Sequence, residues 1–236
     1  MGKLILVRHG KSVWNVANIF TGWTDVDLAP EGIEEANTAG EIIKRHQIAI
    51  DICYSSYLKR AIRTGLIILE HADRMHVDFI KSWKLNERNY GAWQGRNKDE
   101  VKREVGEELF LKVRRGFDTP PPSLQLTDKR HPKFDHLYDT VNSSYLPASE
   151  SLEQTEVRVV EYFFEVIIPE LVKGKTVLVA AHGNSIRGLM AHIENINSSE
   201  IPKVTVPTGV LQVYEFDTNM ILKKKYKLEE KNKIKL

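Results

Sequence analysis

Two histidines follow apolar runs at the places where an α/β protein binds its ligands. His9 comes after residues 3–7, and His182 comes directly after residues 176–181. In a parallel sheet the carboxyl ends of the strands meet helix N-termini, whose free N–H groups favour anions. A glycine follows each histidine and allows close backbone approach, and small polar residues that can cap a helix come next. Either stretch alone could be an ordinary strand-to-helix turn that contains histidine by chance. Because the same pattern occurs twice, we favour an anion-binding site at this edge of the sheet.

Further short motifs resemble those of one enzyme family. They are Leu6-Val7-Arg8-His9-Gly10 with Ser12 and Asn15, Phe20-Thr21-Gly22-Trp23-Thr24-Asp25-Val26, Leu58-Lys59-Arg60-Ala61, Trp83-Lys84-Leu85-Asn86-Glu87-Arg88, Tyr90-Gly91, Arg114-Arg115, Ala180-Ala181-His182-Gly183-Asn184-Ser185 and Pro207-Thr208-Gly209-Val210. Together they resemble the cofactor-dependent phosphoglycerate mutases of the histidine phosphatase superfamily, from about residue 3 to residue 226. The resemblance implies an isomerase of glycolysis and gluconeogenesis that interconverts 3-phosphoglycerate and 2-phosphoglycerate, with 2,3-bisphosphoglycerate as the priming cofactor.

The resemblance also assigns the residues that handle the phosphoryl group. His9 would be the nucleophile and would cycle through phosphohistidine, a role that suits neutral imidazole because it can hold a phosphoryl group covalently. Arg8, Arg60 and His182 would donate to the transferred group. Such transfers are catalysed mainly by positioning and by donors that stabilise charge on the equatorial oxygens, and arginine offers fixed, bidentate donors.

Glu87 and a set of substrate-binding residues complete the implied site. Glu87 has the family's position of the general acid and base, which protonates the leaving oxygen and deprotonates the incoming hydroxyl. Without the resemblance, we would interpret it as a surface salt-bridge partner of Arg88. A ligand with two anionic ends needs a second basic cluster, although Arg114 and Arg115 at a helix end could simply complement the helix dipole. The implied substrate contacts are Ser12, Asn15, Thr21, Gly22, Arg88, Tyr90, Lys98, Arg114, Arg115, Gly183 and Asn184.

Four positions depart from the family pattern beside the implied site. They are Lys11 in place of Glu or Gln, Asn89 in place of His, Trp93 in place of Leu and Val113 in place of Trp. If the Lys11 ammonium points into the pocket, it attracts an anionic substrate, and Lys11→Glu should raise KM modestly while kcat stays equal or rises. If the ammonium points to solvent, the substitution should change neither constant.

Three alternatives share the scaffold or the ligand. A phosphomonoesterase would pass the phosphoryl group to water, and a bisphosphoglycerate synthase would favour the bisphosphorylated product. A catalytically weak phosphoglycerate-binding paralogue is motivated by Lys11 and Asn89. Residues 89–150 favour the mutase over the phosphatase, because an excursion that excludes water would retain the bisphosphorylated intermediate. Ser12 matches the mutases rather than the synthases.

The other histidines do not show the spacing of a metal site. The sequence contains no His-Glu-x-x-His pattern, and one cysteine is too few to form a cysteine-based metal cluster. We therefore predict no metal, and 2,3-bisphosphoglycerate as the cofactor. The histidines concerned are His46, His71, His76, His131, His136 and His192.

The elements that must position these residues alternate between short apolar runs and helical patterns. This alternation predicts an α/β three-layer sandwich with a mixed, mostly parallel sheet flanked by helices. The helix at residues 30–46 is the best marked, with Pro30 in its first turn and three basic residues in its last. The predicted strands are residues 3–7, 51–54, 76–83 and 176–181, and the predicted helices are residues 30–46, 58–72, 98–114 and 151–172.

We predict a single domain over residues 1–236, with an insertion and a C-terminal tail. The sheet rhythm stops at about residues 89–150, which contain three consecutive prolines at 120–122. Such a long excursion in a compact enzyme is typical of a lid or a substrate-binding insertion. Residues 222–236 are rich in lysine, and we interpret them as a solvated C-terminal tail.

Composition excludes several classes of protein. The 236 residues are 42% hydrophobic and 28% charged, which is typical of a globular enzyme and not of a disordered or fibrous chain. The net charge is +2, but residues 222–236 hold seven Lys and two Glu, so the remainder carries −3 and no nucleic-acid partner is expected.

Apolar runs and cysteine content bear on where the protein works. No run approaches the roughly 18 apolar residues of a membrane span, and none resembles a signal peptide, so no membrane association is expected. The one cysteine, Cys53, cannot form an internal disulfide, which favours a reducing compartment. We therefore expect a cytoplasmic enzyme with a small, anionic, phosphorylated substrate, and a homodimer or a homotetramer is left open.

Overall fold

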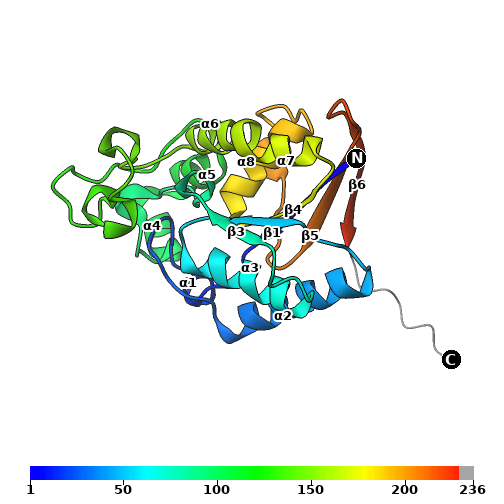
Figure 1. Ribbon diagram of the computed structural model, residues 1–236. Coiled ribbons are helices and arrows are strands. Elements are labelled where there is room, and N and C mark those ends of the chain that lie inside the picture. The colour runs from blue at the N-terminus through cyan, green and yellow to red at the C-terminus, as the bar shows by residue number, and fades with distance from the viewer. Residues whose placement is uncertain (229–236) are drawn as a thin grey trace.

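One mixed sheet lies in the middle of the molecule (Figure 1). The computed structural model describes residues 1–228. Over these residues six strands form the sheet in the order β3-β2-β4-β1-β5-β6, in which β5 runs antiparallel to both neighbours and the pairs among β1 to β4 are parallel. The strands are β1 (Gly2–Arg8), β2 (Ile52–Ser55), β3 (Asp78–Lys81), β4 (Thr176–Ala181), β5 (Leu211–Phe216) and β6 (Leu222–Leu228). The mixed, mostly parallel sheet predicted from the sequence is confirmed.

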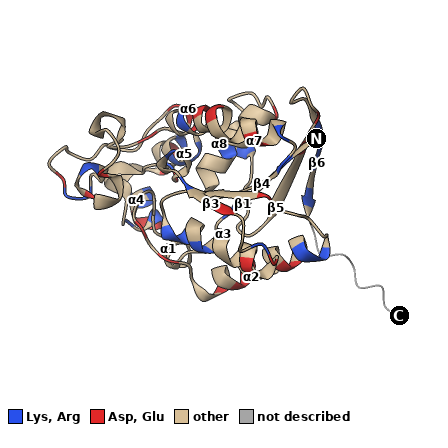
Figure 2. Ribbon diagram, viewed as in Figure 1, with Lys and Arg blue, Asp and Glu red and all other residues tan. Residues whose placement is uncertain are grey.

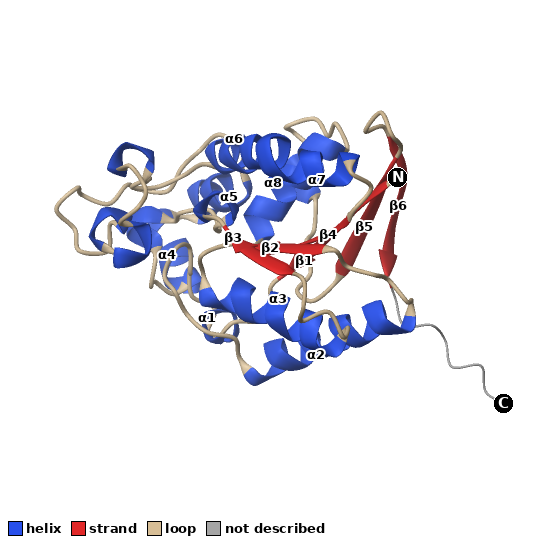
Figure 3. Cartoon of the chain, viewed as in Figure 1, coloured by secondary structure: helices blue, strands red, loops and turns tan. Residues whose placement is uncertain are grey.

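Helices cover both faces of the sheet and produce the three predicted layers (Figure 3). One face carries α2 (Pro30–Arg45) and α3 (Lys59–His71), and the other carries α6 (Leu152–Tyr162), α7 (Ile168–Val172) and α8 (Gly183–Ile193). The remaining helices are α1 (Val13–Val16), α4 (Lys98–Val105) and α5 (Glu107–Arg115), with a π-turn at Phe163–Ile167 and 3-10 turns at Trp83–Leu85, Gly91–Trp93, Pro132–Phe134, His136–Tyr138, Ser143–Tyr145 and Ile201–Lys203.

The central strand β1 is buried on both faces, which explains its continuous apolar sequence. Leu4 and Leu6 pack into the cluster beneath α6 and α8, whereas Ile5 and Val7 pack into the cluster against α2 and α3. This division follows from the two-residue period of a strand. Cys53 on β2 lies in the second cluster, where burial raises the pKa of its thiol, so it is a packing residue.

Three predicted elements differ from the structure. The helix predicted at residues 98–114 is broken into α4 and α5 by Gly106, whose φ of +83° no helix can contain. The helix predicted at residues 151–172 contains the π-turn, which precedes Pro169, a residue without an N–H for the helical ladder. The strand predicted at residues 76–83 is only β3, because a 3-10 turn capped by the Ser82 side chain begins directly after it.

The lysine-rich segment is in part a strand, contrary to the prediction of a solvated tail over residues 222–236. Residues Leu222–Leu228 form β6, which pairs with β5 along the edge of the sheet. Its lysines are exposed, and edge strands often carry lysine because the charge opposes pairing with another chain (Figure 2). The rest of the predicted tail, residues 229–236, lies outside the described residues.

Residues 89–150 add no strand to the sheet over the described chain. They form α4, α5 and several 3-10 turns, which lie at the end of the sheet toward which β1 and β4 run (Figure 1). This placement brings α4 and α5 beside the two strand ends where His9 and His182 stand. No helix among residues 1–228 is both long enough and apolar enough to span a membrane.

Candidate active site

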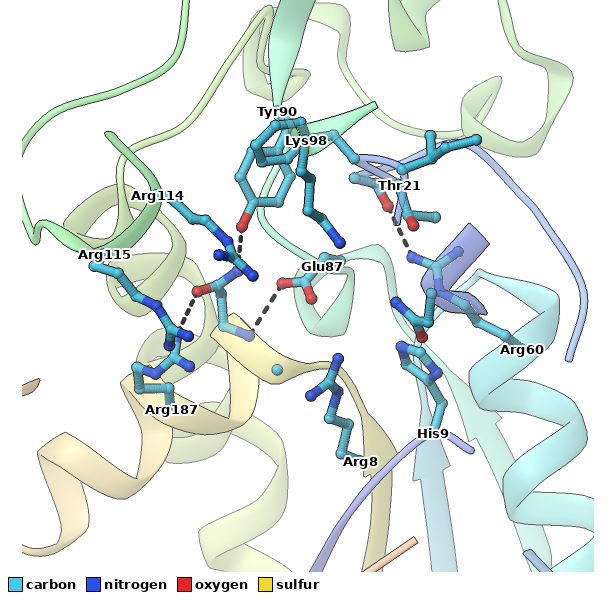
Figure 4. A pocket seen from close by; sticks show the side chains of 16 residues that line it. Arg8, His9, Thr21, Arg60, Glu87, Tyr90, Lys98, Arg114, Arg115 and Arg187 are labelled. Atoms are coloured by element: carbon cyan, nitrogen blue, oxygen red, sulfur yellow. Dashed lines mark hydrogen bonds between the residues drawn. The ribbon is translucent and has the colours of Figure 1, made fainter. Parts of the chain in front are cut away.

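A polar pocket opens at the carboxyl ends of β1 and β4 (Figure 4). Its walls come from the end of β1, the loop before α2, α3, the segment after the Trp83–Leu85 turn, α4, α5 and α8. Most residues that the sequence singled out meet here. The lining residues are Arg8, His9, Asn15, Ile19, Phe20, Thr21, Gly22, Arg60, Glu87, Tyr90, Lys98, Arg114, Arg115, Gly183, Asn184 and Arg187.

His9 is held in one tautomer at the base of the pocket. Its Nδ1 lies 2.6 Å from the carbonyl oxygen of Gly10, and because a carbonyl only accepts, Nδ1 must carry the proton. Burial, together with the charges of Arg60 and Arg8, holds the pKa of His9 well below its ordinary value. The ring is therefore neutral near pH 7, and the lone pair on Nε2 is available for nucleophilic attack.

Gly10 makes close backbone packing possible beside the nucleophile. A Cβ at this position would lie 2.0 Å from the carbonyl oxygen of Gly32 on α2, which no side chain could accept. The Gly10 amide also donates to the Thr64 hydroxyl on α3. The glycine after His9 thus lets two neighbouring helices fix the loop that carries the nucleophile.

Arg60 and Arg8 present fixed positive charge next to His9. The Arg60 guanidinium is buried and donates to the backbone carbonyls of Gly22 and Thr24, at 2.8 and 3.0 Å. Burial lowers the pKa of Arg60 to about 10, which leaves it charged at neutral pH. Arg8 donates to the Val206 carbonyl at 2.9 Å.

Several buried polar atoms around these arginines have no hydrogen-bond partner among residues 1–228. They are Nε of Arg8, Nε of Arg60 and Oγ1 of Thr21, all of which belong to pocket-lining residues. Buried donors without partners are costly, and an anion accepting from them would remove that cost. The donor set therefore fits a phosphoryl group beside His9 Nε2.

Glu87 faces the same space with one carboxylate oxygen. Its Oε1 accepts from the backbone amides of Arg88 and Asn184, at 2.8 and 3.1 Å. A Cβ built on Gly183 would lie 3.6 Å from Oε2 of Glu87 and 3.5 Å from Cζ of Arg8, so both groups border the space above that glycine. Oε2 is thus the oxygen placed to exchange a proton with a ligand. Glu87 is 8% exposed, which excludes the surface salt-bridge interpretation.

A second basic cluster forms the other end of the pocket. It comprises Lys98 on α4, Arg114 and Arg115 on α5, and Arg187 on α8 (Figure 4). Burial, aided by the charges of Arg114 and Arg8, lowers the pKa of Lys98 to about 8. The pocket therefore has two separated basic ends, with Glu87 between them, and fits a small ligand with two anionic groups.

Arg187 is a lining residue that the sequence analysis missed. It donates to the Asn184 side chain at 2.6 Å and to the Val204 carbonyl at 2.9 Å. The signal was its helical spacing, since residue i+3 from Asn184 and i+4 from Gly183 shares their side of α8.

Three predicted site residues do not line the pocket. Ser12 is buried and caps α1, with its hydroxyl accepting from the amide of Asn15. His182 lies beside His9, with 5.0 Å between ring centroids, and its Nε2 is 2.8 Å from the Ser56 hydroxyl. Burial and the charge of Arg60 hold the pKa of His182 well below its ordinary value.

Arg88 is the third of these residues. Its guanidinium is buried and donates to the backbone carbonyls of Glu150, Val113 and Thr119. The last two lie at the end of α5 and just after it. Arg88 therefore anchors the segment that carries Arg114 and Arg115; it is not among the lining residues, and its direct contact with substrate stays a prediction.

The departures from the family pattern have local explanations. Asn89 accepts from the Gly91 amide at 2.8 Å and donates to the Pro147 carbonyl at 2.9 Å, so it joins the two ends of the 89–150 excursion. Trp93 and Val113 belong to one buried cluster, where a larger and a smaller side chain offset each other in volume. Lys11 is exposed and does not line the pocket.

Known proteins resemble this chain over nearly its whole length. The family model of the histidine phosphatase superfamily (branch 1) matches residues 4–128 and 123–228. A 2,3-bisphosphoglycerate-dependent phosphoglycerate mutase of Nautilia profundicola is 54% identical over 97% of this chain and 100% of its own length. The mutase of the same name from Treponema denticola is 49% identical over 95% and 91%, and phosphoglycerate mutase 1 of Saccharomyces cerevisiae is 46% identical over 93% and 89%.

Solved structures support the fold. A mycobacterial glucosyl-3-phosphoglycerate phosphatase superposes with a TM-score of 0.72 at 19% identity, covering 96% of this chain and 97% of its own. YhfR of Bacillus stearothermophilus superposes with a TM-score of 0.71 at 21% identity, covering 94% of both chains. Since family membership rests on the sequence matches and the fold agrees with it, the chain belongs to the histidine phosphatase superfamily (branch 1), among the 2,3-bisphosphoglycerate-dependent phosphoglycerate mutases.

Proposed function

We propose that this enzyme interconverts 3-phosphoglycerate and 2-phosphoglycerate through a phosphohistidine at His9. The observation that carries the proposal is the single pocket in which a neutral His9, with Nδ1 tied to Gly10, faces unpartnered arginine donors, while a second basic cluster lies beyond Glu87. Such a pocket suits a ligand with a phosphoryl group at one end and another anionic group at the other. The relatives of the same family carry the name of this activity.

The residues divide the reaction into two matched transfers. In the first transfer the bond between phosphorus and Nε2 of the primed His9 breaks as a free hydroxyl of phosphoglycerate binds the phosphorus, and Glu87 Oε2 takes the proton of that hydroxyl, which gives the bisphosphorylated intermediate. Arg8 and Arg60 stabilise the charge on the equatorial oxygens. In the second transfer, after the bisphosphorylated ligand has reoriented, Nε2 of His9 binds the other phosphorus as its bond to the ligand oxygen breaks, and Glu87 returns the proton to that oxygen.

The priming cofactor fits the same residues. When bound, 2,3-bisphosphoglycerate supplies the phosphoryl group that first loads His9. Arg8, Arg60 and Thr21 would hold one phosphoryl end, and Lys98, Arg114 and Arg115 would hold the other end of the molecule. This arrangement needs no metal, and no group of three or more His, Cys, Asp or Glu side chains among residues 1–228 is placed to hold one.

An assay of 3-phosphoglycerate conversion, with and without 2,3-bisphosphoglycerate, tests the proposed function. We expect turnover that depends on the bisphosphate, with little release of inorganic phosphate. Phosphate release that is faster than isomerisation would instead support a phosphomonoesterase. Tight binding of phosphoglycerate without turnover would support the non-catalytic paralogue.

The ionisation of Lys98 should set the alkaline limb of activity. Because the pKa of Lys98 is lowered to about 8, its positive charge is lost as the pH rises through that value, and kcat/KM for phosphoglycerate should fall by roughly tenfold. Lys98→Arg should move this limb out of the range, since arginine stays charged. A limb that persists unchanged in Lys98→Arg, measured as kcat/KM against pH, would contradict the assignment.

Substitution of Lys11 should have little effect on catalysis. Its exposed position outside the pocket favours the second of the two outcomes set out above, so Lys11→Glu should leave kcat and KM within about twofold of the starting enzyme, as expected for a solvent-screened charge. Steady-state kinetics at low and physiological ionic strength measure this. A large fall in kcat at unchanged KM would mean that Lys11 takes part in the transition state.

Chelators should leave the activity intact, whereas vanadate should block it. Arg8, Arg60 and the neighbouring histidines would provide the charge stabilisation that Mg²⁺ provides in kinases, and vanadate can mimic the transferring phosphoryl group. Turnover with EDTA, and separately with vanadate, is the measurement. Loss of activity in EDTA with recovery on adding a divalent metal would point to a different mechanism.

The proposal includes a cytoplasmic setting and a small phosphorylated substrate as the principal partner. The buried thiol of the one cysteine, Cys53, supports a reducing compartment. We propose neither a nucleic-acid nor a membrane partner. A homodimer and a homotetramer would be distinguished by light scattering of the purified enzyme.

A further inference from the structure

We propose that Arg158 and Glu150 are positioning residues that aim the Glu87 carboxylate at the reacting oxygen. This inference rests on the proposed function, in which Glu87 exchanges the proton. Neither residue lines the pocket, and both are almost fully buried, Arg158 at 7% and Glu150 at 3% exposure. Their contacts lead to the backbone on both sides of Glu87.

Every N–H group of the Arg158 guanidinium has a partner. Two bind the Glu150 carboxylate, from Nε at 2.6 Å and from Nη2 at 2.9 Å. The other three bind the backbone carbonyls of Lys84, Asn86 and Glu87, at 2.7, 3.0 and 2.9 Å. A guanidinium offers five donors in a rigid plane, so one side chain on α6 fixes three carbonyls within four consecutive residues.

Glu150 completes the support from the other end of the 89–150 excursion. Its carboxylate also accepts from the Asn89 amide at 2.8 Å, and its own amide donates to the Asn89 carbonyl at 2.9 Å. Its backbone carbonyl accepts from Arg88. The residues on the carboxyl side of Glu87 are therefore hydrogen-bonded to Glu150, and those on its amino side are hydrogen-bonded to Arg158.

The orientation of the Glu87 side chain depends on this backbone. One of the two amides that hold Oε1 is that of Arg88, the residue between the two fastened segments. The Glu87 carbonyl accepts a second bond from the Trp23 indole, whose ring lies under the Arg158 guanidinium at 5.6 Å. A small rotation of residues 86–89 would thus turn Oε2 away from the ligand without closing the pocket. Misplacement of a catalytic group by about 1 Å can lower a rate by about 100-fold.

The ion pair between Arg158 and Glu150 is buried. A carboxylate and a guanidinium removed from water are costly and need complete hydrogen bonding, which this pair has. The hydrogen bonds of this network hold the backbone of the short segment that contains the general acid and base, Glu87. We therefore expect its loss to affect proton transfer more than substrate binding.

A double-mutant cycle between Arg158→Lys and Glu87→Gln tests the inference. The measurement is the single-turnover rate of His9 phosphorylation by 2,3-bisphosphoglycerate, with the dissociation constant of the bisphosphate determined separately. Arg158→Lys keeps the charge but has three donors instead of five. We expect it to lower the rate by about 100-fold in the enzyme with Glu87, with the dissociation constant changed by less than about threefold. In the Glu87→Gln background the same change should lower the rate by less than about threefold, because the group being positioned is already inactive.

Two further variants control for folding. Thr155→Val removes a buried hydrogen bond to Ser151 on the same helix, one turn before Arg158, and should leave the rate unchanged. Glu150→Gln should reproduce the non-additive loss in a milder form, and it serves alone if Arg158→Lys does not fold. Melting temperatures identify any variant that fails to fold.

The possible results separate the inference from the function on which it rests. Equal fold-losses from Arg158→Lys in both backgrounds would overturn the positioning role while leaving Glu87 as the acid and base. A full rate in Glu87→Gln itself would overturn the proposed role of Glu87. Non-additivity with an unchanged dissociation constant is the result that supports the inference.

Discussion

Substitution of His9 by alanine is expected to lower mutase turnover by roughly 10⁴- to 10⁶-fold, the scale seen when a covalent nucleophile is removed. The reason is that no other side chain in the pocket combines a neutral nitrogen with a free lone pair beside the arginine donors. The measurement is steady-state turnover together with the yield of phosphoenzyme. Both should be lost.

The structure should tolerate this change. His9 directly follows β1 and does not belong to either apolar cluster of the sheet, so the alanine variant should keep its secondary structure and cooperative unfolding. His76→Ala, on an exposed residue remote from the pocket lining, is the matched control and should retain full activity. Retention of an acid-labile phosphoryl group in His9→Ala would contradict the assignment.

Replacement of Arg60 by lysine is expected to lower kcat/KM by about 10²- to 10³-fold, the usual cost of removing one fixed donor from a transition state. Arg60 already uses two groups to hold the Gly22 and Thr24 carbonyls, and its buried Nε remains for the ligand. A lysine ammonium is a single point of charge and cannot hold both carbonyls and also reach the phosphoryl group.

Arg63→Lys provides the control on the same helix. Arg63 forms an exposed ion pair with Asp27 and does not line the pocket, so its substitution should change the rate by less than about twofold. Equal effects of the two substitutions would mean that Arg60 contributes only the stability of α3. A fall in affinity for vanadate in Arg60→Lys alone would locate the loss at the transferring group.

The fold was largely predictable because its central elements are locally strong. β1 and β4 are continuous apolar runs, and α2 has a proline in its first turn and basic residues in its last. The predictions were wrong where a single residue breaks a helix and where a strand forms only by pairing at the edge of the sheet. Gly106 divides a helical pattern in two, and β6, with its alternation hidden by lysines, owes its existence to pairing with β5.

The site was predictable to a different degree at each residue. His9 could be found from the sequence because it directly follows a strand, whereas Arg60 and Glu87 could be assigned only through resemblance to a family. The three backbone carbonyls that Arg88 holds could not be predicted, because sequence does not reveal which way a side chain turns within a loop. Arg187 was missed because the recognised motif ends at Ser185, although its helical spacing from Gly183 and Asn184 places it on their side of α8.

The positioning network was invisible for the same physical reason. Arg158 and Glu150 are eight residues apart, and this spacing alone does not distinguish their ion pair from the many other possible pairs of charged residues in the sequence. What gives it meaning is the set of backbone carbonyls around Glu87, which lie more than 70 residues away in the chain. Such contacts follow from the packing of α6 on the sheet and not from any local pattern.

The central claim is that the phosphoryl group is carried on Nε2 of His9. Identifying which nitrogen is phosphorylated tests this claim most directly. The enzyme would be loaded with labelled 2,3-bisphosphoglycerate, the modified residue mapped by peptide mass spectrometry and the nitrogen identified by NMR. Because Nδ1 is bound to the Gly10 carbonyl, we predict a phosphoryl group on Nε2 of His9 alone, which is transferred to 3-phosphoglycerate when that substrate is added. Phosphate on Nδ1 or on another residue, or full turnover with no phosphoenzyme, would contradict the account.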